Sequence, residues 1–336
     1  MPLQADSFWV SVDDQQLHVR YYGSAHPNTS TTTPAILMLH GSVGSGRIFY
    51  SRSDKGLGPW LARQGFEVYI PDLSGRGQSL PPVGPESHET QTDQIHRQIP
   101  ALIDAIAERH GDDCVLQAVA HSWGGVLLSA YLAKAATGAL PLPSLAIQSM
   151  VFLGTKRAVS WRNPWRLIPL DLLWGLYGEL QTRWKGYLPS KQLGFGSDNE
   201  PAGVYRGCKA WVYSGRRWRD PIDGFNYANA LKHLRKSSVQ FPPTLLLSGS
   251  GDRYLGHPQD VETFSQELQS PSAVHLRLGK QYGNALDYDH VTLCTAPEAQ
   301  SDHFPLIADW LRGKRSRFPI SPIIPIIPTV DYRAQS

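Results

Sequence analysis

Ser122 is the residue whose surroundings most clearly suggest chemistry. It lies in AHSWGG, between an apolar run that ends at Ala120 and a segment with the composition of a helix. A sharp strand-to-helix turn strains the serine backbone and requires small residues two positions away on either side, and here these are Ala120 and Gly124. Taken alone, such a serine more often caps the helix that follows it. We predict a nucleophile, because suitable partner residues follow further along the chain.

These partners are a carboxylate and an imidazole. A serine hydroxyl becomes nucleophilic when an imidazole takes its proton, and a carboxylate must hold that imidazole in the correct tautomer. Asp252 ends the apolar run of LLLSGSGD, and His290 lies in DYDH, after the run AVHLRLG. Asp252 could instead cap a turn, but the alternative strand end, FLGTKRAV, offers no carboxylate. His257 and His303 compete with His290, although His303 begins an apparent helix, a poor place for a mobile base.

The oxyanion that forms during such a reaction needs backbone N–H donors. We expect these donors from Trp123, directly after the nucleophile, and from Ser42 in the segment LHGSVG. His121 adjoins the nucleophile, and we expect it to point away from the site and to serve packing. Asp72, in PDLSGRG, is expected to organise its own loop.

Nucleotide and metal sites are not indicated. GSVGSGR (41–47) has glycines spaced as in a phosphate-binding loop, but Arg47 and Ile48 replace the required Lys and Ser/Thr. The segment also lacks the G-x-G-x-x-G order of a dinucleotide site. His, Asp and Cys residues do not occur at metal-ligand spacing. We therefore predict neither a cofactor nor a metal.

The elements that must position these residues follow an α/β pattern. Two alternating runs, 8–12 and 17–22, predict an antiparallel hairpin. Continuous apolar runs then alternate with helical periodicity, as for strands buried on both faces of a mostly parallel sheet. Strands are expected at 35–41, 66–73, 114–120, 145–154, 244–252 and 273–279, and a helix at 92–111 that ends at Gly111.

Residues 157–240 interrupt this alternation. They contain six tryptophans, Trp161, Trp165, Trp174, Trp184, Trp211 and Trp218. We interpret them as a cap inserted between two parts of one core, 1–156 and 241–313. The segment 314–336 is Pro/Ile-rich and is predicted to form an extended arm, since proline is excluded from helix interiors and central strands.

The cap region also has a local excess of positive charge. From 156 to 236 there are fifteen Lys and Arg against six Asp and Glu, a local excess of +9 that the whole-chain value of +3 hides. Basic residues interleaved with Trp and Leu suit an amphiphilic substrate or peripheral contact with a membrane surface. The alternative is an ordinary solvated surface over a tryptophan-filled cap core. If the cap covers Ser122, it should line an apolar pocket for an acyl chain.

Composition limits the remaining possibilities. A net charge of +3 does not indicate a nucleic-acid partner. Three scattered cysteines, Cys114, Cys208 and Cys294, fit neither a disulfide framework nor a zinc site. Neither a signal peptide nor an apolar run of the roughly 20 residues needed to span a membrane is evident. We expect a cytoplasmic protein, and the oligomeric state is left open.

Taken together, LHGSVG, PDLSGRGQS, AHSWGG, LLLSGSGD and DYDH resemble an α/β-hydrolase with a cap inserted after the sixth strand, although Ala120 stands where the family usually has glycine. The resemblance covers about 35–156 and 241–313. It implies a serine hydrolase that cleaves a small-molecule carboxylic ester with the triad Ser122, Asp252 and His290. A thioesterase, lactonase, C–C hydrolase or acyltransferase on the same fold, or a non-catalytic ligand receptor, stays open. Dehalogenases and epoxide hydrolases of this fold carry Asp at the position of Ser122.

Overall fold

The computed structural model describes residues 3–23, 34–111, 114–159, 164–235 and 241–315. Its centre is an eight-stranded sheet in the order β1-β2-β4-β3-β5-β6-β9-β10. The strands from β4 to β10 are parallel, and the hairpin of β1 and β2 joins them antiparallel at one edge. The strands are β1 (Gln4–Val12), β2 (Gln15–Gly23), β3 (Ala35–Leu39), β4 (Glu67–Pro71), β5 (Leu116–His121), β6 (Ile147–Leu153), β9 (Thr244–Gly249) and β10 (Ala273–Leu278).

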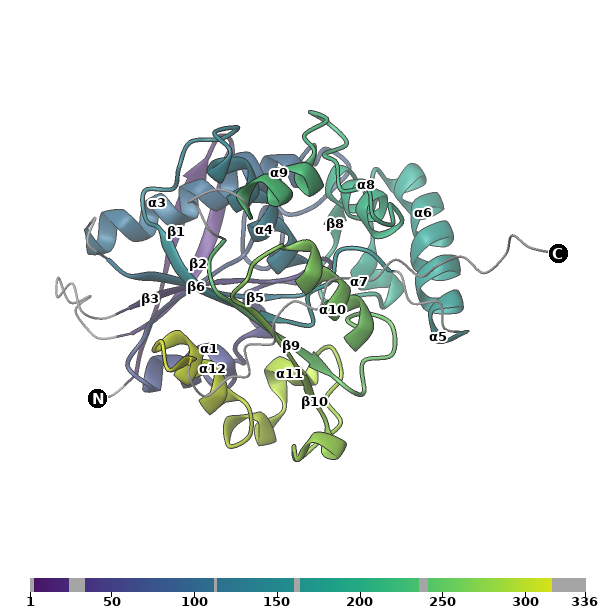
Figure 1. Cartoon of the computed structure of the whole chain (residues 1–336). Coiled ribbons are helices and arrows are strands. Elements are labelled where there is room, and N and C mark those ends of the chain that lie inside the picture. Colours follow the sequence, from purple (N-terminus) through teal and green to yellow (C-terminus); the bar gives the residue numbers. More distant parts are fainter. Residues whose placement is uncertain (1–2, 24–33, 112–113, 160–163, 236–240, 316–336) are drawn as a thin grey trace.

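Two layers of helices cover the sheet (Figure 1). One face is covered by α3 (Ile99–His110), α4 (Trp123–Ala136), α9 (Tyr227–Leu234) and α10 (Pro258–Glu267). The other face is covered by α1 (Leu57–Arg63), α11 (Thr292–Thr295) and α12 (Phe304–Leu311). The α/β fold with its hairpin, predicted from the apolar runs, is therefore confirmed.

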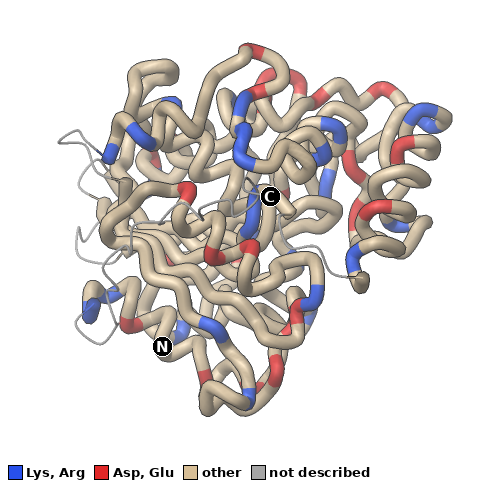
Figure 2. The backbone as a smooth tube through the Cα atoms, turned by 45° about the vertical axis from the view of Figure 1, so that its right-hand side comes forward, with Lys and Arg blue, Asp and Glu red and all other residues tan. Residues whose placement is uncertain are grey.

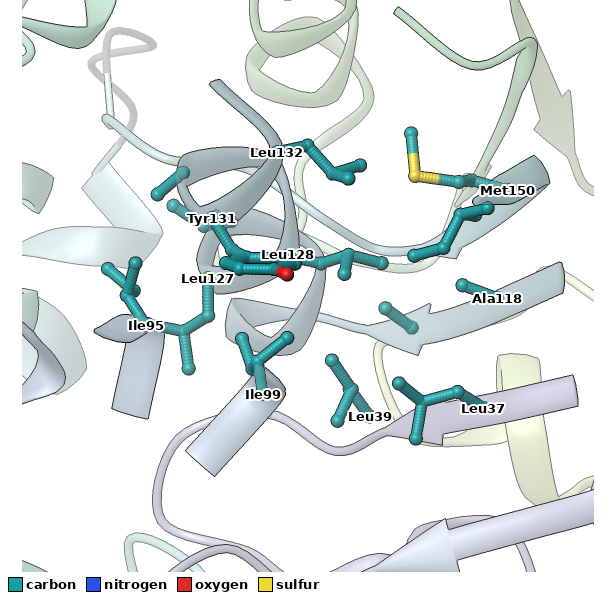
Figure 3. Close-up of a cluster of buried hydrophobic side chains, with 14 of the residues drawn as sticks. Leu37, Leu39, Ile95, Ile99, Ala118, Leu127, Leu128, Tyr131, Leu132 and Met150 are labelled. Atoms are coloured by element: carbon teal, nitrogen blue, oxygen red, sulfur yellow. The ribbon is translucent and has the colours of Figure 1, made fainter. Parts of the chain in front are cut away.

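The side-chain alternation of β3 shows why those runs are continuous. Leu37 and Leu39 pack into the core under α3 and α4, whereas Ile36 and Met38 pack into the core on the α1 side. A strand between two helical layers must be apolar on both faces. Figure 3 shows Leu37 and Leu39 directed toward Leu127, Leu128 and Ile99 of the first layer.

The predicted helix at 92–111 is present in three consecutive pieces. These are α2 (Gln91–Asp93), a π-helical stretch η2 (Gln94–Gln98) and α3. Thr90 and Asp93 form a capping box at its start, and Gly111 follows its end with φ of 82°. Such a conformation costs glycine little, so Gly111 ends the helix as expected.

The segment between β6 and β9 departs from the α/β pattern. It contains α5 (Pro164–Arg166), a π-helical stretch η3 (Leu167–Tyr177), α6 (Gly178–Lys185), α7 (Ser190–Leu193), α8 (Ala202–Val212), α9 and a short antiparallel pair, β7 (Tyr187–Leu188) with β8 (Glu200–Pro201). We call the continuous helix 164–185 the cap helix. It lies at the periphery of the molecule (Figure 1). The predicted extended arm falls almost wholly outside the described residues.

Candidate active site

The turn at Ser122 joins β5 to α4 in a strained conformation. Ser122 has φ of 52° and ψ of −122°, which a residue with a side chain rarely adopts. Gly124 lies so close to β3 that a Cβ atom there would be 2.5 Å from the Leu39 carbonyl oxygen and 2.6 Å from that of His40. A side chain at position 124 would push the helix off the sheet. Packing against β3 therefore requires the glycine that the sequence has at position 124.

His290 and Asp252 are brought together as predicted. The Nδ1 atom of His290 lies 2.7 Å from Oδ2 of Asp252, and Oδ1 of Asp252 accepts the backbone N–H of Leu255 at 2.9 Å. Burial by itself would raise the pKa of Asp252, but the nearby His290, its hydrogen bond and that of the Gly256 backbone lower this pKa below its ordinary value. The carboxylate therefore stays charged and can hold the His290 ring in one orientation.

The rival acids and bases are engaged elsewhere. His303 is buried and its Nε2 lies 2.8 Å from the Leu293 carbonyl oxygen, while His257 caps α10. Asp287 accepts hydrogen bonds from Ser250 and the Lys280 backbone. Among the described residues, Asp252 is the only acid within hydrogen-bonding distance of the His290 ring.

His121 does not point away from the site. Its ring centroid lies 4.7 Å from that of His290, and its Nε2 lies 2.9 Å from the His290 carbonyl oxygen. Burial, followed by the proximity of His290, lowers the pKa of His121 to about 3, so the ring is neutral at ordinary pH. The expected direction was therefore wrong, because His121 at the end of β5 faces the loop that carries His290, and a packing role stays a prediction.

The loop after β3 packs against the turn that carries Ser122. A Cβ atom at Gly41 would lie 2.8 Å from Cβ of Ser122, so this loop is in direct contact with the turn. Within the described chain, the backbone N–H groups of Ser42 and Trp123 donate no hydrogen bond, whereas that of Val43 donates to Glu200. These two N–H groups are thus available as donors, and their part in an oxyanion site stays a prediction.

Two neighbouring polar residues hold this loop in place. His40 accepts the Leu73 N–H through Nε2 at 3.0 Å and contacts the Gly41 carbonyl through Nδ1 at 2.7 Å. Asp72 is buried and accepts the N–H groups of Gly46 at 2.8 Å and Gln78 at 3.0 Å. Asp72 organises its loop, as predicted.

The cap is attached to this loop by a buried ion pair that we did not predict. Glu200, in β8 of the cap, lies 3.0 Å from Nη1 of Arg76, and both side chains are buried. Its other oxygen accepts the N–H of Val43. Glu200 therefore links the cap to the segment PDLSGRG and to the candidate oxyanion loop.

A cavity of about 670 Å³ lies between the core and the cap, and Ser122 and His290 both line it. Most other lining side chains are apolar. Those of the cap include Leu170, Leu173, Trp174, Phe195 and Val212. The predicted apolar pocket over Ser122 is therefore present, and its size suits a ligand of moderate length.

The cap tryptophans are divided between the cavity wall, a buried cluster and the surface. Only Trp174 of those described lines the cavity. Trp211 and Trp218 are buried in an aromatic cluster with Tyr227, whereas Trp165 and Trp184 are exposed. Trp161 lies outside the described residues.

Lys156 is a second residue of the cavity wall that we did not single out. It lies three residues after the end of β6 and is 7% exposed. Within the described parts of the chain, its ammonium group forms neither a hydrogen bond nor an ion pair. Burial lowers its pKa, and the neighbouring Asp260, Cys208 and Asp252 oppose this effect.

One group of side chains away from the cavity has the composition of a metal site. His96, Asp220 and Asp223 lie close enough to share an ion. However, Nζ of Lys134 is 2.7 Å from Nε2 of His96, 3.4 Å from Asp220 and paired with Asp223. The ammonium already supplies the positive charge that would attract these ligands, so this group does not fit a metal.

Comparisons with known proteins agree with this architecture. The α/β-hydrolase fold family model matches residues 34–293. A search of curated proteins finds no match. Among solved structures, haloalkane dehalogenase DatA from Agrobacterium tumefaciens C58 is similar with a TM-score of 0.56 and 18% identity, covering 94% of this chain and 97% of the other.

Two esterases are similar to the same degree. A putative aryl esterase from Burkholderia cenocepacia has a TM-score of 0.55 and 18% identity, covering 93% of this chain and 100% of the other. Carboxylesterase CesB (YbfK) from Bacillus subtilis has a TM-score of 0.53 and 19% identity, covering 93% of each chain. Identities this low support a shared fold only. Because the family model matches most of the chain, including the strand that leads to Ser122, this chain belongs to the α/β-hydrolase fold family.

Proposed function

We propose that the protein hydrolyses carboxylic esters with apolar acyl groups through an acyl-enzyme on Ser122. The observation that carries this proposal is the serine on a strained turn, which shares one cavity with the His290–Asp252 pair. The esterases among the similar structures add support at the level of the fold.

In the proposed reaction, Oγ of Ser122 attacks the ester carbonyl carbon while Nε2 of His290 takes the hydroxyl proton. The carbonyl oxygen becomes an oxyanion that accepts the N–H groups of Ser42 and Trp123. The bond to the alcohol oxygen then breaks, and His290 returns its proton to the leaving alcohol. Water attacks the acyl-enzyme by the same route, which releases the acid and restores Ser122.

The nucleophile distinguishes this chemistry from dehalogenation. When a carboxylate displaces a halide from carbon, it forms an ester whose carbonyl water can attack. A serine oxygen in the same step would form an ether, which has no carbonyl and would block the enzyme. Ser122 therefore favours acyl transfer despite the likeness to a dehalogenase. Thioesters and lactones pass through the same acyl-enzyme and are the nearest alternatives.

A fluorophosphonate probe and a series of chromogenic esters test this proposal. We expect the probe to label the wild type and not Ser122→Ala. Ser197→Ala is a matched control, because Ser197 lines the same cavity without belonging to the triad, and labelling should persist. Burial of each CH₂ group is worth about 0.8 kcal/mol, so kcat/KM should rise with acyl length until the cavity is full. A protein that resists the probe would instead be a ligand receptor, and equal rates from acetate to long chains would exclude the acyl pocket.

The cap helix supports a second part of the proposal, which is that the enzyme takes its substrate from a lipid surface. Large apolar side chains are exposed along this helix, and Trp165 near one end and Trp184 near the other are 61% and 78% exposed. The others are Leu167, Ile168, Leu172, Leu173, Leu176, Tyr177 and Leu180. A helix this apolar is normally buried on all sides, and an exposed patch of this kind marks an interaction site.

The charges beside the helix favour a lipid bilayer as the occupant. Glu179 is surrounded by three cations, Arg183, Arg206 and Lys209, at 3.2–3.3 Å. With one carboxylate and three cations, this group has a net positive charge. It forms a basic rim beside the apolar surface, and such a rim would attract anionic lipid headgroups. Basic residues also occur elsewhere, however, since Lys and Arg are distributed over the whole molecule in Figure 2.

The position of the cap helix relative to the cavity gives this surface a role. Leu170, Leu173 and Trp174 line the cavity that contains Ser122, while Leu176 and Trp184 of the same helix face solvent. An acyl chain leaving a bilayer would therefore meet the cap helix before the nucleophile. Among the described residues, no helix has the length and apolar character needed to cross a bilayer, so the proposed contact is peripheral.

Vesicle sedimentation tests this part. We expect the wild type to sediment with phosphatidylserine-containing vesicles, less so in 1 M salt because the screening length falls to about 3 Å. The double variant Leu176→Gln/Trp184→Gln should stay in solution. Trp9→Gln is the control, because Trp9 is 47% exposed but lies in the hairpin, away from the cap. Equal sedimentation of both variants would overturn the proposal. A concentration-dependent dimer that the double variant abolishes would assign the surface to a second copy, and wild-type binding that appears only after removal of residues 316–336 would assign it to that segment.

A further inference from the structure

We infer that Lys156 forms an anion subsite in the substrate cavity, and that the ester hydrolysed at Ser122 carries a carboxylate. This inference rests on the proposed ester hydrolysis and specifies the substrate class. The evidence for this inference does not depend on the triad, because Lys156 has no role in the proposed reaction.

A lone lysine in this position is unusual. Lysine is almost never buried without a partner, because removing an ammonium group from water is costly. Lys156 is 93% buried, from an exposed fraction of 7%, and it lines a cavity whose wall is otherwise mostly apolar. The fold thus places a lysine that has no contact partner among the described residues at the place where substrate would bind.

The neighbouring acids do not neutralise it by contact. Both oxygens of Asp252 are used, one by His290 and one by the Leu255 N–H. Asp260 is buried at the start of α10 and acts on Lys156 only through its field, without an ion pair between them. Arg166, the remaining charged neighbour, forms bonds with Asp171. A ligand anion would therefore be the direct partner that Lys156 lacks.

The sheet places Lys156 next to the reacting groups. β6, which leads to it, pairs with β5, which ends at the nucleophile turn. Gly154, two residues before Lys156, lies so close to His290 that a Cβ atom there would be 2.9 Å from Nδ1. An anion on Lys156 would therefore be held on the histidine side of the cavity by a charge-assisted hydrogen bond.

The second cation of the cavity wall differs from Lys156 in its exposure. Arg47 also lines the cavity, but its side chain is exposed and lies over the Tyr50 ring at 4.9 Å. Solvent screens such a group, so it should contribute little to recognition of a substrate anion. Arg47 therefore provides a matched control.

The test compares two p-nitrophenyl esters of equal length, a half-ester of adipic acid that ends in a carboxylate and the same molecule with that carboxylate methylated. We expect the wild type to favour the charged ester at least about tenfold in kcat/KM, mainly through KM, because the contact is made equally in the ground and transition states. Lys156→Met should lose this preference while it still hydrolyses the neutral ester. Arg47→Met should keep it, and Lys156→Arg should retain part of it.

Fluorophosphonate labelling separates this inference from the proposed function. Adipate should protect Ser122 from labelling in the wild type and in Arg47→Met, but not in Lys156→Met. Thermal unfolding shows whether the variants are folded. Lys156→Met should have a melting temperature no lower than that of the wild type, because the substitution removes an unpaired buried charge. Labelling without protection by adipate and without preference for the charged ester would overturn the anion subsite alone. A protein that adipate binds through Lys156 but that the probe never labels would keep the subsite and overturn the esterase.

Discussion

The wall of the cavity is made from two regions that differ in how they hold their residues. On the core side, Ser122, His290 and the loop at Gly41 are fixed by close backbone packing and by hydrogen bonds with few alternatives. On the cap side, the cap helix contributes Leu170, Leu173 and Trp174 to the cavity wall, whereas Leu176 and Trp184 on its outer face are exposed. The core side is therefore built for fixed geometry, whereas the outer face of the cap helix can change without disturbing it.

The largest expected effect is on the core side. Ser122→Ala should lower kcat by about 10⁴-fold or more, because the serine, histidine and aspartate act as one unit. Adding Asp252→Asn or His290→Ala to it should therefore cost little more, as steady-state assays of single and double variants would show. Additive losses would mean that the three residues do not form a triad.

The second effect concerns the link between the two regions. Glu200→Ala leaves Arg76 buried without its partner and should lower the free energy of unfolding by about 3–5 kcal/mol. It should also reduce kcat, because the Val43 N–H loses its acceptor beside the oxyanion loop. Urea denaturation and ester assays measure the two losses. A variant with wild-type stability would show that the cap is held by its apolar contacts alone.

An intermediate effect is expected from acid. Burial, followed by the proximity of Arg76, lowers the pKa of His40 to about 4, and His121 is lowered to about 3. Their unfolded values are near 6.5, so between that pH and the folded values the unfolded chain binds more protons. Stability is thus complete above about pH 6.5 and falls on acidification, by up to about 1.4 kcal/mol per pH unit for each histidine. Melting temperatures from pH 7 to pH 4 test this, and His40→Asn should flatten the slope.

The smallest effect is expected on the outer face of the cap helix. Leu176→Gln and Trp184→Gln should each change the free energy of unfolding by no more than about 0.5 kcal/mol, because both side chains are exposed. Hydrolysis of a dissolved short-chain ester should also be unchanged. A large loss of stability would show that this face is covered in solution.

The features that the sequence predicted well are local in the chain. The turn at Ser122 depends on Ala120 and Gly124, Asp252 ends one apolar run, and His290 lies in the loop that follows another. The carboxyl ends of parallel strands meet at one edge of a sheet. Once the apolar runs are identified as parallel strands, the residues that follow them are predicted to lie close together.

Residues whose role depends on contacts between distant segments could not be assigned in this way. Glu200 and Arg76 are 124 positions apart, and nothing near either one indicates that both are buried. The sequence likewise does not show that the cap tryptophans lie in three different environments, which are the cavity wall, a buried cluster and the surface. Lys156 could have been found from the sequence, since it follows a buried strand in FLGTKRAV. The expected chemistry required only a carboxylate at that strand end.

The pairing of β6 with β9 has a consequence for how this protein could change over evolutionary time. The two strands are parallel neighbours, with Met150 opposite Thr244, so the whole insertion leaves and re-enters the core at adjacent strands. Closing a longer or shorter loop between such points costs little, about 0.6 kcal/mol for each doubling of its length. Recombination could therefore exchange the cap as a module and give descendants with new substrate ranges, while the reactive serine and its partners are inherited unchanged.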